Sequence, residues 1–140
     1  MAKKKKLLSP QVHAFMYLWY GEPNTDGKYL HWNHEVLPHW EQRINEQFPK
    51  VGMRFEPPGN IHSPYYPLHG PYSSSDVVTL DRQFQEMVES GIEVAVVSWW
   101  GQRDKEYATD TQGVNTDLAV ANLLQQADKN GKIKVALHLE

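Results

Sequence analysis

The sequence VAVVSWWG (residues 94–101) is an apolar run that ends abruptly in two tryptophans and a glycine. A nearly continuous run of Val and Ala between breakers predicts a strand buried on both faces, as in parallel sheets covered by helices. Ligands of α/β folds bind at the carboxyl ends of such strands. We therefore expect Trp99 and Trp100 to lie at the mouth of a binding site; the alternative is that both rings belong to the core.

The composition is that of a folded protein with an excess of aromatic rings. The 140 residues are 40% hydrophobic and 22% charged, which is enough for one ordinary domain with a core. A net charge of −3 argues against nucleic acid as a partner. Five Trp and seven Tyr suit the apolar faces of sugars, and the absence of Cys excludes disulfides, thiolate zinc sites and cysteine nucleophiles.

The first residues predict neither a signal peptide nor a membrane span. Four lysines at positions 3–6 are followed by only two leucines before Pro10, whereas a signal peptide needs an apolar region of about 7–15 residues. No apolar stretch approaches the roughly 20 residues of a transmembrane helix. Residues 1–11 are predicted to be a basic disordered tail and residues 12–140 the folded domain.

Two more strands and two helices surround the opening stretch in the sequence. The apolar segments 12–20 and 133–140 predict the strands. The first helix follows the N-cap candidates of residues 73–76, has apolar residues at helical spacing from Val77 to Val88, and stops at Gly91. The second begins at Thr116 or Asp117 and ends at Asn130-Gly131. Its predicted inner stripe consists of Leu118, Ala121, Leu124 and Ala127.

Residues 21–71 form a connection far longer than usual, and they carry eight of the nine prolines. Their many aromatic residues argue against disorder. A short helix is predicted over residues 38–45, with Pro38 in its first turn. We expect the segment to be an ordered excursion over the top of the fold.

The element order β, long loop, α, β, α, β predicts an α/β fold with a parallel sheet and right-handed crossovers. Three such strands with two helices leave both sheet edges and one face open. We therefore expect an incomplete domain, the first three β/α units of a (β/α)8 TIM-type barrel with a long ordered loop after the first strand. Glu140 then occupies the carboxyl end of the third strand, where such folds place active groups.

The segment DGKYLHWNH (residues 26–34) has the densest polar and aromatic cluster. His31 and His34 could share a metal ion, but no nearby Asp, Glu or Cys completes a ligand set, so no metal site is predicted. The sequence contains no serine nucleophile elbow, P-loop or dinucleotide fingerprint. Glycoside cleavage needs a carboxyl pair. Glu140 is one candidate and Glu22 a second, although Glu22 also reads as a solvated loop residue.

Six motifs occur in one order and spacing: WYG (19–21), DGKYLHWNH (26–34), YP (66–67), GPYSS (70–74), SW (98–99) and HLE (138–140). Together they resemble the amino-terminal part of the glycoprotein endo-α-1,2-mannosidases, glycoside hydrolase family 99. The resemblance covers residues 12–140, and DGKYLHWNH is its most specific motif.

The resemblance implies a (β/α)8 barrel that hydrolyses an internal α-1,2-mannosidic bond in glucosylated N-glycans, with retention and without a cofactor. Tyr20, Trp100 and Glu140 would line the sugar subsites for this mannose-containing oligosaccharide. The other substrate-binding candidates are His31, Trp32, Trp99 and His138. For Trp99 the alternative is a place in the core.

The catalytic glutamates of the family lie in a Glu-x-x-Glu motif on a late strand, so they are expected downstream of Glu140. The 140-residue chain is therefore expected to be inactive alone. Two alternatives are a sugar-binding remnant without chemistry and an open sheet that does not fold alone. The family resemblance also implies the Golgi lumen or membrane as the compartment, and the oligomeric state is not predicted.

Overall fold

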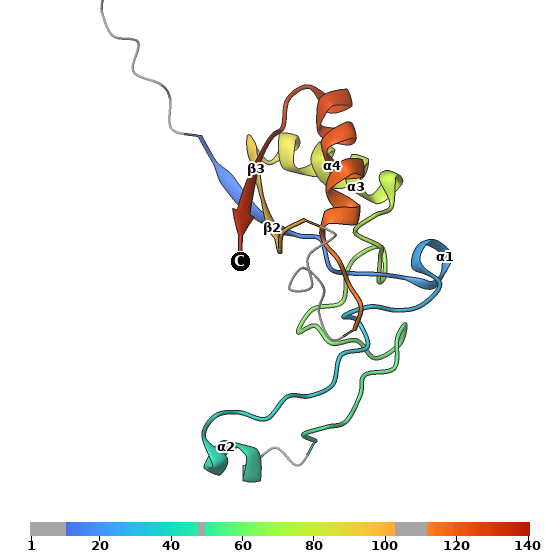
Figure 1. Cartoon of the computed structure of the whole chain (residues 1–140), viewed down its shortest axis with the longest axis vertical. Coiled ribbons are helices and arrows are strands. Elements are labelled where there is room, and N and C mark those ends of the chain that lie inside the picture. Colours follow the sequence, from blue (N-terminus) through green and yellow to red (C-terminus); the bar gives the residue numbers. More distant parts are fainter. Residues whose placement is uncertain (1–10, 48–49, 103–111) are drawn as a thin grey trace, which may run out of the picture.

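The computed structural model of the chain describes residues 11–47, 50–102 and 112–140. The predicted tail, apart from Gln11, lies outside this range. The elements follow one another as β1 (His13–Tyr17), α1 (Pro23–Asp26), α2 (Gln42–Gln47), α3 (Val77–Glu89), β2 (Val94–Trp99), α4 (Asp117–Asn130) and β3 (Lys134–Leu139) (Figure 1). The predicted β/α order is confirmed.

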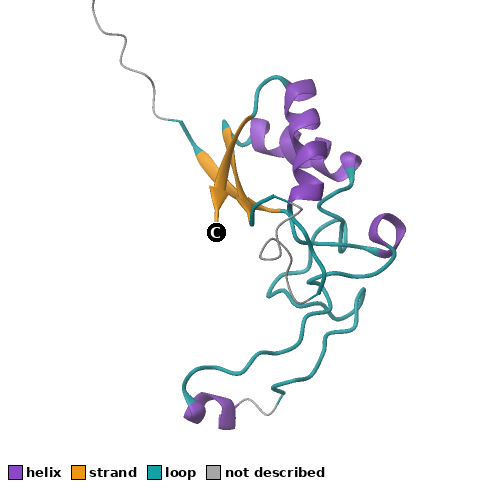
Figure 2. Ribbon diagram, in the orientation of Figure 1, coloured by secondary structure: helices purple, strands orange, loops and turns teal. Residues whose placement is uncertain are grey.

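The three strands form one parallel sheet in the order β1-β2-β3, with β2 in the centre (Figure 2). Tyr17 pairs with Ser98, and Ser98 pairs with His138, so the carboxyl ends of the strands lie level at one edge. The central position explains the apolar run of β2, because Ala95 and Val97 are fully buried. β1 ends three residues earlier than predicted, since the chain leaves the sheet at Leu18 to enter the core.

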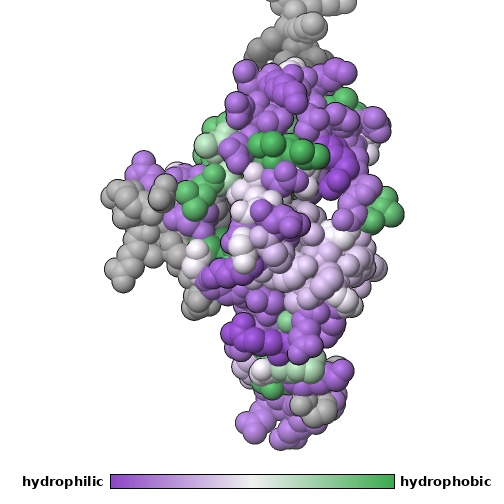
Figure 3. Space-filling model, turned by 90° about the vertical axis from the view of Figure 1, so that its right-hand side faces the viewer, coloured by the Kyte–Doolittle hydropathy of each residue, from purple (hydrophilic) through white to green (hydrophobic). Residues whose placement is uncertain are grey.

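α3 and α4 cover one face of the sheet, and the hydrophobic core lies between them and the strands (Figure 1). Leu80 and Phe84 of α3 and Leu123 of α4 are fully buried against Ala95 and Val97 of β2. The outer surface on the helix side is mostly hydrophilic, with separate hydrophobic patches (Figure 3). This is the amphipathic pattern from which the helices were predicted.

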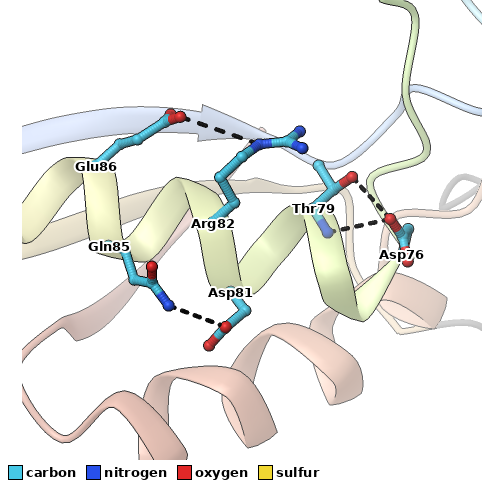
Figure 4. Close-up of polar contacts among 6 residues, drawn as sticks. All are labelled: Asp76, Thr79, Asp81, Arg82, Gln85 and Glu86. Atoms are coloured by element: carbon cyan, nitrogen blue, oxygen red, sulfur yellow. Dashed lines mark hydrogen bonds and ion pairs between the residues drawn. The ribbon is translucent and has the colours of Figure 1, made fainter. Parts of the chain in front are cut away.

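α3 begins and ends where the sequence predicts. Asp76 is its N-cap, and the carboxylate accepts hydrogen bonds from the N–H groups of Val78 (3.1 Å) and Thr79 (3.0 Å) and from Thr79 Oγ1 (2.7 Å). Gly91 follows the helix at φ 76°, a conformation that glycine adopts without strain. Asp81 and Gln85, one turn apart, are hydrogen-bonded on the side of α3 that faces α4 (Figure 4), and Lys129 of α4 pairs with Asp81 at 3.7 Å.

The predicted inner stripe of α4 is wrong except at Ala127. The buried residues are Ala119, Val120, Leu123, Gln126 and Ala127. Leu118 and Leu124 are 51% and 47% exposed, and Ala121 is exposed as well. The first turns of α4 are apolar on more than one side, so helical spacing fits two different apolar stripes. Packing on the sheet buries the stripe that contains Ala119, Val120 and Leu123 and leaves the predicted stripe exposed, apart from Ala127.

The excursion of residues 21–71 starts at the carboxyl end of β1. α1 follows directly, and the chain then runs out to α2 and back. Antiparallel bridges join Gly21 to Leu30 and Glu35 to Arg54. Figure 1 shows that the part carrying α2 extends away from the sheet, so the expectation that the excursion lies over the fold is wrong for that part.

The helix predicted over residues 38–45 is shifted, because α2 begins at Gln42 and Pro38 is outside it. Side chains hold the preceding backbone in another conformation. Asn45 Oδ1 accepts from the N–H of His39 at 2.6 Å, and Asn45 Nδ2 donates to the carbonyl of His39 at 2.8 Å. The His39 ring in turn accepts the N–H of Glu41 at 3.0 Å. These bonds compete with a helical turn at residue 39.

The second face of the sheet and both outer strands carry exposed apolar side chains. Phe15 and Tyr17 of β1 are 59% and 43% exposed, and Leu137 and Leu139 of β3 are 48% and 65% exposed. Within the described ranges no helix is long and apolar enough to cross a membrane. The sheet thus has the arrangement of a few β/α units, with helices on one side only.

Candidate functional site

Aromatic side chains gather where the three strands end. Trp19 and Tyr20 follow β1, Trp100 follows β2, and Glu140 follows β3. His31, which belongs to the excursion, contacts the rings of Trp19 and Trp100. We call Trp19, Tyr20, His31, Trp100 and Glu140 the ring site. Its place at the carboxyl ends of parallel strands agrees with the sequence-based prediction.

Trp100 and Glu140, which directly follow the neighbouring strands β2 and β3, are in direct contact. The indole Nε1–H of Trp100 donates to Glu140 Oε2 at 3.3 Å, and the backbone N–H of Trp100 donates to Thr116 Oγ1 at 3.0 Å. The backbone N–H of Glu140 donates to the carbonyl of Trp99 at 3.2 Å. An exposed hydrogen bond thus joins the carboxylate to the edge of the indole.

Trp19 is the centre of the ring contacts, and the sequence did not single it out. Tyr17 stacks on it at a centroid distance of 4.4 Å, and His31 stacks on it at 5.5 Å with an interplanar angle of 14°. Trp100 lies at 5.4 Å with a tilt of 32°. Trp19 is thus in contact with Tyr17, His31 and Trp100 at once.

Tyr20 also belongs to a second group of rings, which it forms with Trp32 and Tyr72. Its ring stacks on Trp32 at 4.0 Å, and both meet Tyr72 edge-on. Trp32 is only 2% exposed and donates its Nε1–H to the carbonyl of Tyr72 at 2.8 Å. Burial, with the neighbouring Tyr20, raises the pKa of Tyr72. Trp32 thus packs against Tyr20 as a buried neighbour. That Trp32 contacts the substrate stays a prediction.

Ser74 connects this group to the sheet. Its Oγ accepts from the N–H of Tyr20 at 3.1 Å and donates to the carbonyl of Tyr17 at 3.3 Å. The N–H of Ser74 donates to the carbonyl of Tyr20 at 2.8 Å. Buried to 2% exposure, Ser74 holds the chain that leads into α3 against the end of β1.

His31 has positive φ (59°), as no other non-glycine residue of the described part of the chain does. The turn around it is closed by the N–H of Trp32, which donates to the carbonyl of Leu30 at 2.7 Å. The N–H of His31 donates to Gln112 Oε1 at 3.1 Å. A positive φ is uncommon for a residue other than glycine, and strained backbone of this kind is enriched at functional sites.

Besides Trp32, two more predicted substrate-binding residues, Trp99 and His138, lie outside the ring site. Trp99 packs against the core on the helix side and donates its Nε1–H to Asp117 Oδ1 at 3.0 Å. His138 lies in the sheet, where its ring meets Phe15 edge-on at 5.4 Å. Because strand residues alternate between faces, Trp99 and its neighbour Trp100 point in different directions. A role in substrate binding remains a prediction for both residues.

Glu22 is partly exposed to solvent, as expected of a loop residue, and it is also the N-cap of α1. Its carboxylate caps α1, accepting the N–H groups of Asn24 and Thr25 and both of their side chains at 2.8–2.9 Å. Partial burial would raise the pKa of Glu22, but these hydrogen bonds together lower it. An ionised, fully hydrogen-bonded carboxylate is unsuited to general acid catalysis.

The ring site combines flat apolar surfaces with a fixed carboxylate, which suits the C–H faces and hydroxyl groups of a sugar. A cavity of about 480 Å³ lies elsewhere, beside α2, and is lined by Val36, Leu37, Ile44 and Val51 among others. No group of three or more metal-ligating side chains in the described ranges is placed to hold a metal ion.

Comparison with known proteins gives one consistent result. Residues 7–140 match the model of glycosyl hydrolase family 99. The chain is 42% identical over 129 residues to glycoprotein endo-alpha-1,2-mannosidase from Rattus norvegicus and 40% identical to that from Mus musculus. These alignments cover 92% of the chain but 26% of each relative. The chain thus spans about a quarter of the length of the curated relatives it matches.

A solved structure agrees with the sequence match. The chain is similar to the GH99 endo-alpha-mannosidase from Bacteroides thetaiotaomicron, with a TM-score of 0.69 and 29% identity. The similarity covers 92% of the chain and 33% of the bacterial protein. The family model and the relatives bear out the resemblance drawn from the six motifs: the chain belongs to glycosyl hydrolase family 99.

Proposed function

We propose that the ring site binds a mannose-containing oligosaccharide as part of an endo-α-1,2-mannosidase. The observation that carries this proposal is the hydrogen bond between Trp100 Nε1 and Glu140 Oε2 at 3.3 Å. It joins an aromatic platform to a carboxylate at the carboxyl ends of two adjacent strands. Sugar rings stack on indole through their C–H groups, and their hydroxyl groups donate to a carboxylate at the edge of the same indole.

The proposal includes the barrel. The three parallel strands, covered by helices on one face only, would be the first three β/α units of a (β/α)8 barrel. The exposed apolar residues of β1 and β3 would then contact neighbouring barrel strands and helices. The family relationship and the parallel β/α order support this arrangement.

The chemical step would be hydrolysis of an internal α-1,2-mannosidic bond in a glucosylated N-glycan, with retention. A retaining glycosidase places two carboxyl groups about 5–5.5 Å apart. Among the described residues, the ring site has Glu140 as its one carboxylate, and Glu22 is engaged as a cap. We therefore propose that the catalytic pair lies outside this chain, and that the 140-residue chain binds the glycan without cleaving it.

The second candidate function is sugar binding without any associated hydrolysis. The single carboxylate of the described ring site favours it, because stacking and hydrogen bonding need no carboxyl pair. As for the compartment, an N-glycan substrate would place the protein in the Golgi lumen or at its membrane. Immunofluorescence of the tagged protein in its native cells, against Golgi markers, tests this part.

Titration of the chain with an α-1,2-linked mannose disaccharide, followed by calorimetry, tests the binding proposal. We expect the Trp100→Ala variant to bind about threefold to tenfold more weakly, because a stacking surface is lost. Glu140→Gln should weaken binding by about tenfold, because a charged hydrogen-bond acceptor is lost. Trp40→Ala is the matched control, since Trp40 is 88% exposed and contacts His39 in the excursion.

Incubation of the chain with a glucosylated mannose oligosaccharide tests the catalytic part. Release of a glucosylated mannose product would show that the chain contains its own catalytic groups. Absence of binding at millimolar disaccharide would refute both candidate functions. Equal loss of affinity in Trp40→Ala and Trp100→Ala would move the binding surface away from the ring site.

A further inference from the structure

Three histidines form a line of rings that leads from the excursion to the ring site. The ring of His62 lies 5.1 Å from His34, and His34 lies 5.8 Å from His31. Phe55 closes the outer end of the line at 5.2 Å from His62. At the inner end His31 stacks on Trp19 and lies 6.2 Å from Trp100.

Backbone bonds hold this line in place. The N–H of His62 donates to the carbonyl of Trp32 at 2.8 Å, and the N–H of His34 donates to the carbonyl of His31 at 3.2 Å. His34 Nδ1 lies 2.9 Å from the carbonyl of Glu35. Because a carbonyl only accepts, Nδ1 carries the proton, and the Nε2 of His34 is free of this bond. His34 is therefore held in one orientation between its two neighbours.

We propose that His34 and His62 are positioning residues for the ring site, and that a charge on the His62 ring loosens the site and weakens glycan binding. The inference rests on the proposed function for its glycan readout but not for its structural readout. With the His62 ring neutral, His31 stacks on Trp19, and Trp19 in turn contacts Trp100. A charge on His62 faces two further imidazoles, and its repulsion is relieved when the rings separate.

The charge environment supports this direction. Partial burial lowers the pKa of His62, and the neighbouring His34 and His31 lower it further. His62 therefore takes up its proton at a lower pH than an ordinary histidine does. The titratable and charged described residues around the line are Tyr20, Lys28, Glu35, Arg54 and Glu140. Glu35 and Arg54 pair with each other at 3.7 Å, and Glu140 accepts from Trp100.

NMR of the 140-residue chain between about pH 8 and about pH 5 tests the structural part. The imidazole C–H resonances give the titration of each histidine, and the indole Nε1–H resonance of Trp100 reports its bond to Glu140. We expect the Trp100 resonance to shift with the same midpoint as His62. In His62→Gln this shift should disappear. His62→Phe is a second variant, which keeps an aromatic ring beside Phe55 and His34.

The matched control is His69→Gln, which removes an exposed histidine from the turn before α3. It should leave the titration of Trp100 as in the unmodified chain. A Trp100 resonance that stays constant while His62 titrates would overturn the inference. So would an unchanged shift in both His62 variants.

Disaccharide titrations at the two ends of this pH range add the glycan readout. We expect affinity to fall by about fivefold at the acidic end in the unmodified chain and in His69→Gln. In His62→Gln the affinity should be nearly independent of pH. An equal acid loss in all three proteins would overturn the inference. Absence of binding at both ends would refute the proposed function instead, and the Trp100 resonance would then decide the inference alone.

Discussion

The sheet with its two helices is held by one shared core of mostly apolar side chains, with Thr79, Ser98 and Gln126 as buried polar members, whereas the excursion of residues 21–71 is held by single hydrogen bonds and stacked rings. Of the buried hydrophobic residues in the described ranges, the excursion contributes Trp32 and Ile61 alone. The core on the helix side of the sheet includes Leu80, Phe84 and Leu123. Two parts of one short chain are thus stabilised in different ways.

The difference lies in how many interactions must break together. A core residue contacts many others, so its truncation destabilises the whole layer of sheet and helices. The excursion depends on separate contacts, such as the Gly21–Leu30 bridge and the Asn45 bonds to His39. We therefore expect the excursion to open at lower free energy than the layer of sheet and helices. The ring site takes residues from both regions.

The largest expected effect comes from a core truncation in α4. Leu123→Ala removes a fully buried side chain and should lower the free energy of unfolding by about 2–5 kcal/mol. Leu124→Ala, at the next residue, removes a side chain that is 47% exposed and should change it by about 0.5 kcal/mol at most. Urea denaturation followed by circular dichroism measures both. Equal losses would mean that the two apolar stripes of α4 are buried to the same extent.

The layer of sheet and helices could be predicted from the sequence because its signals are local and periodic. The run of residues 94–99 predicted a buried strand, and Asp76 and Gly91 marked the ends of α3. The stripe of α4 failed, because its apolar residues surround the helix and packing alone decides between them. Pro38 misled the prediction of α2, because the Asn45 side chain overrides the local preference of the backbone.

The ring site was predictable in part. Trp100 and Glu140 both follow strands, and the parallel order brings such residues to one edge. Trp19, Tyr72 and His62 were missed as members of the site or its support, because their contacts depend on the path of the excursion. That path follows from bonds between distant residues, such as His62 to Trp32, for which the sequence has no periodic signal.

A glycine substitution tests the excursion without touching the core. A Cβ on Gly21 would lie 2.7 Å from Leu30 Cδ1 and 2.9 Å from Leu30 Cγ. Gly21→Ala should therefore separate the bridge to Leu30 and destabilise the excursion locally by about 1–3 kcal/mol. Hydrogen exchange should show faster exchange at the amides of Gly21 and Leu30, which are bonded to each other's carbonyls, and unchanged protection in β2.

Gly59→Ala is the matched control within the excursion, because a Cβ at this position meets nothing within 4 Å. It should leave both amides protected. If Gly21→Ala lowered the protection of β2 as much as that of residues 21–30, the excursion and the sheet would unfold as one unit. The contrast between the two regions would then be wrong.

The smallest expected effect concerns the N-cap of α3, at the junction of the two regions. Asp76→Ala removes the acceptor for two N–H groups and should lower the free energy of unfolding by about 1 kcal/mol at pH 7. The effect should depend on pH. Partial burial would raise the pKa of Asp76, but the hydrogen bonds from Thr79 and Val78, with the nearby Arg82, together hold it below 3.8.

A carboxyl group whose folded-state pKa is lowered contributes stability that is complete above the unfolded value and lost as the pH falls through the folded value. The difference between the unmodified chain and Asp76→Ala should therefore persist down to about pH 3.8, the ordinary pKa of an aspartate, and shrink at lower pH. Urea denaturation at a series of pH values measures it. Asp76→Asn keeps an uncharged cap and should retain most of the stability at pH 7. A pH-independent difference would show that the cap acts through its shape, with no contribution from its charge.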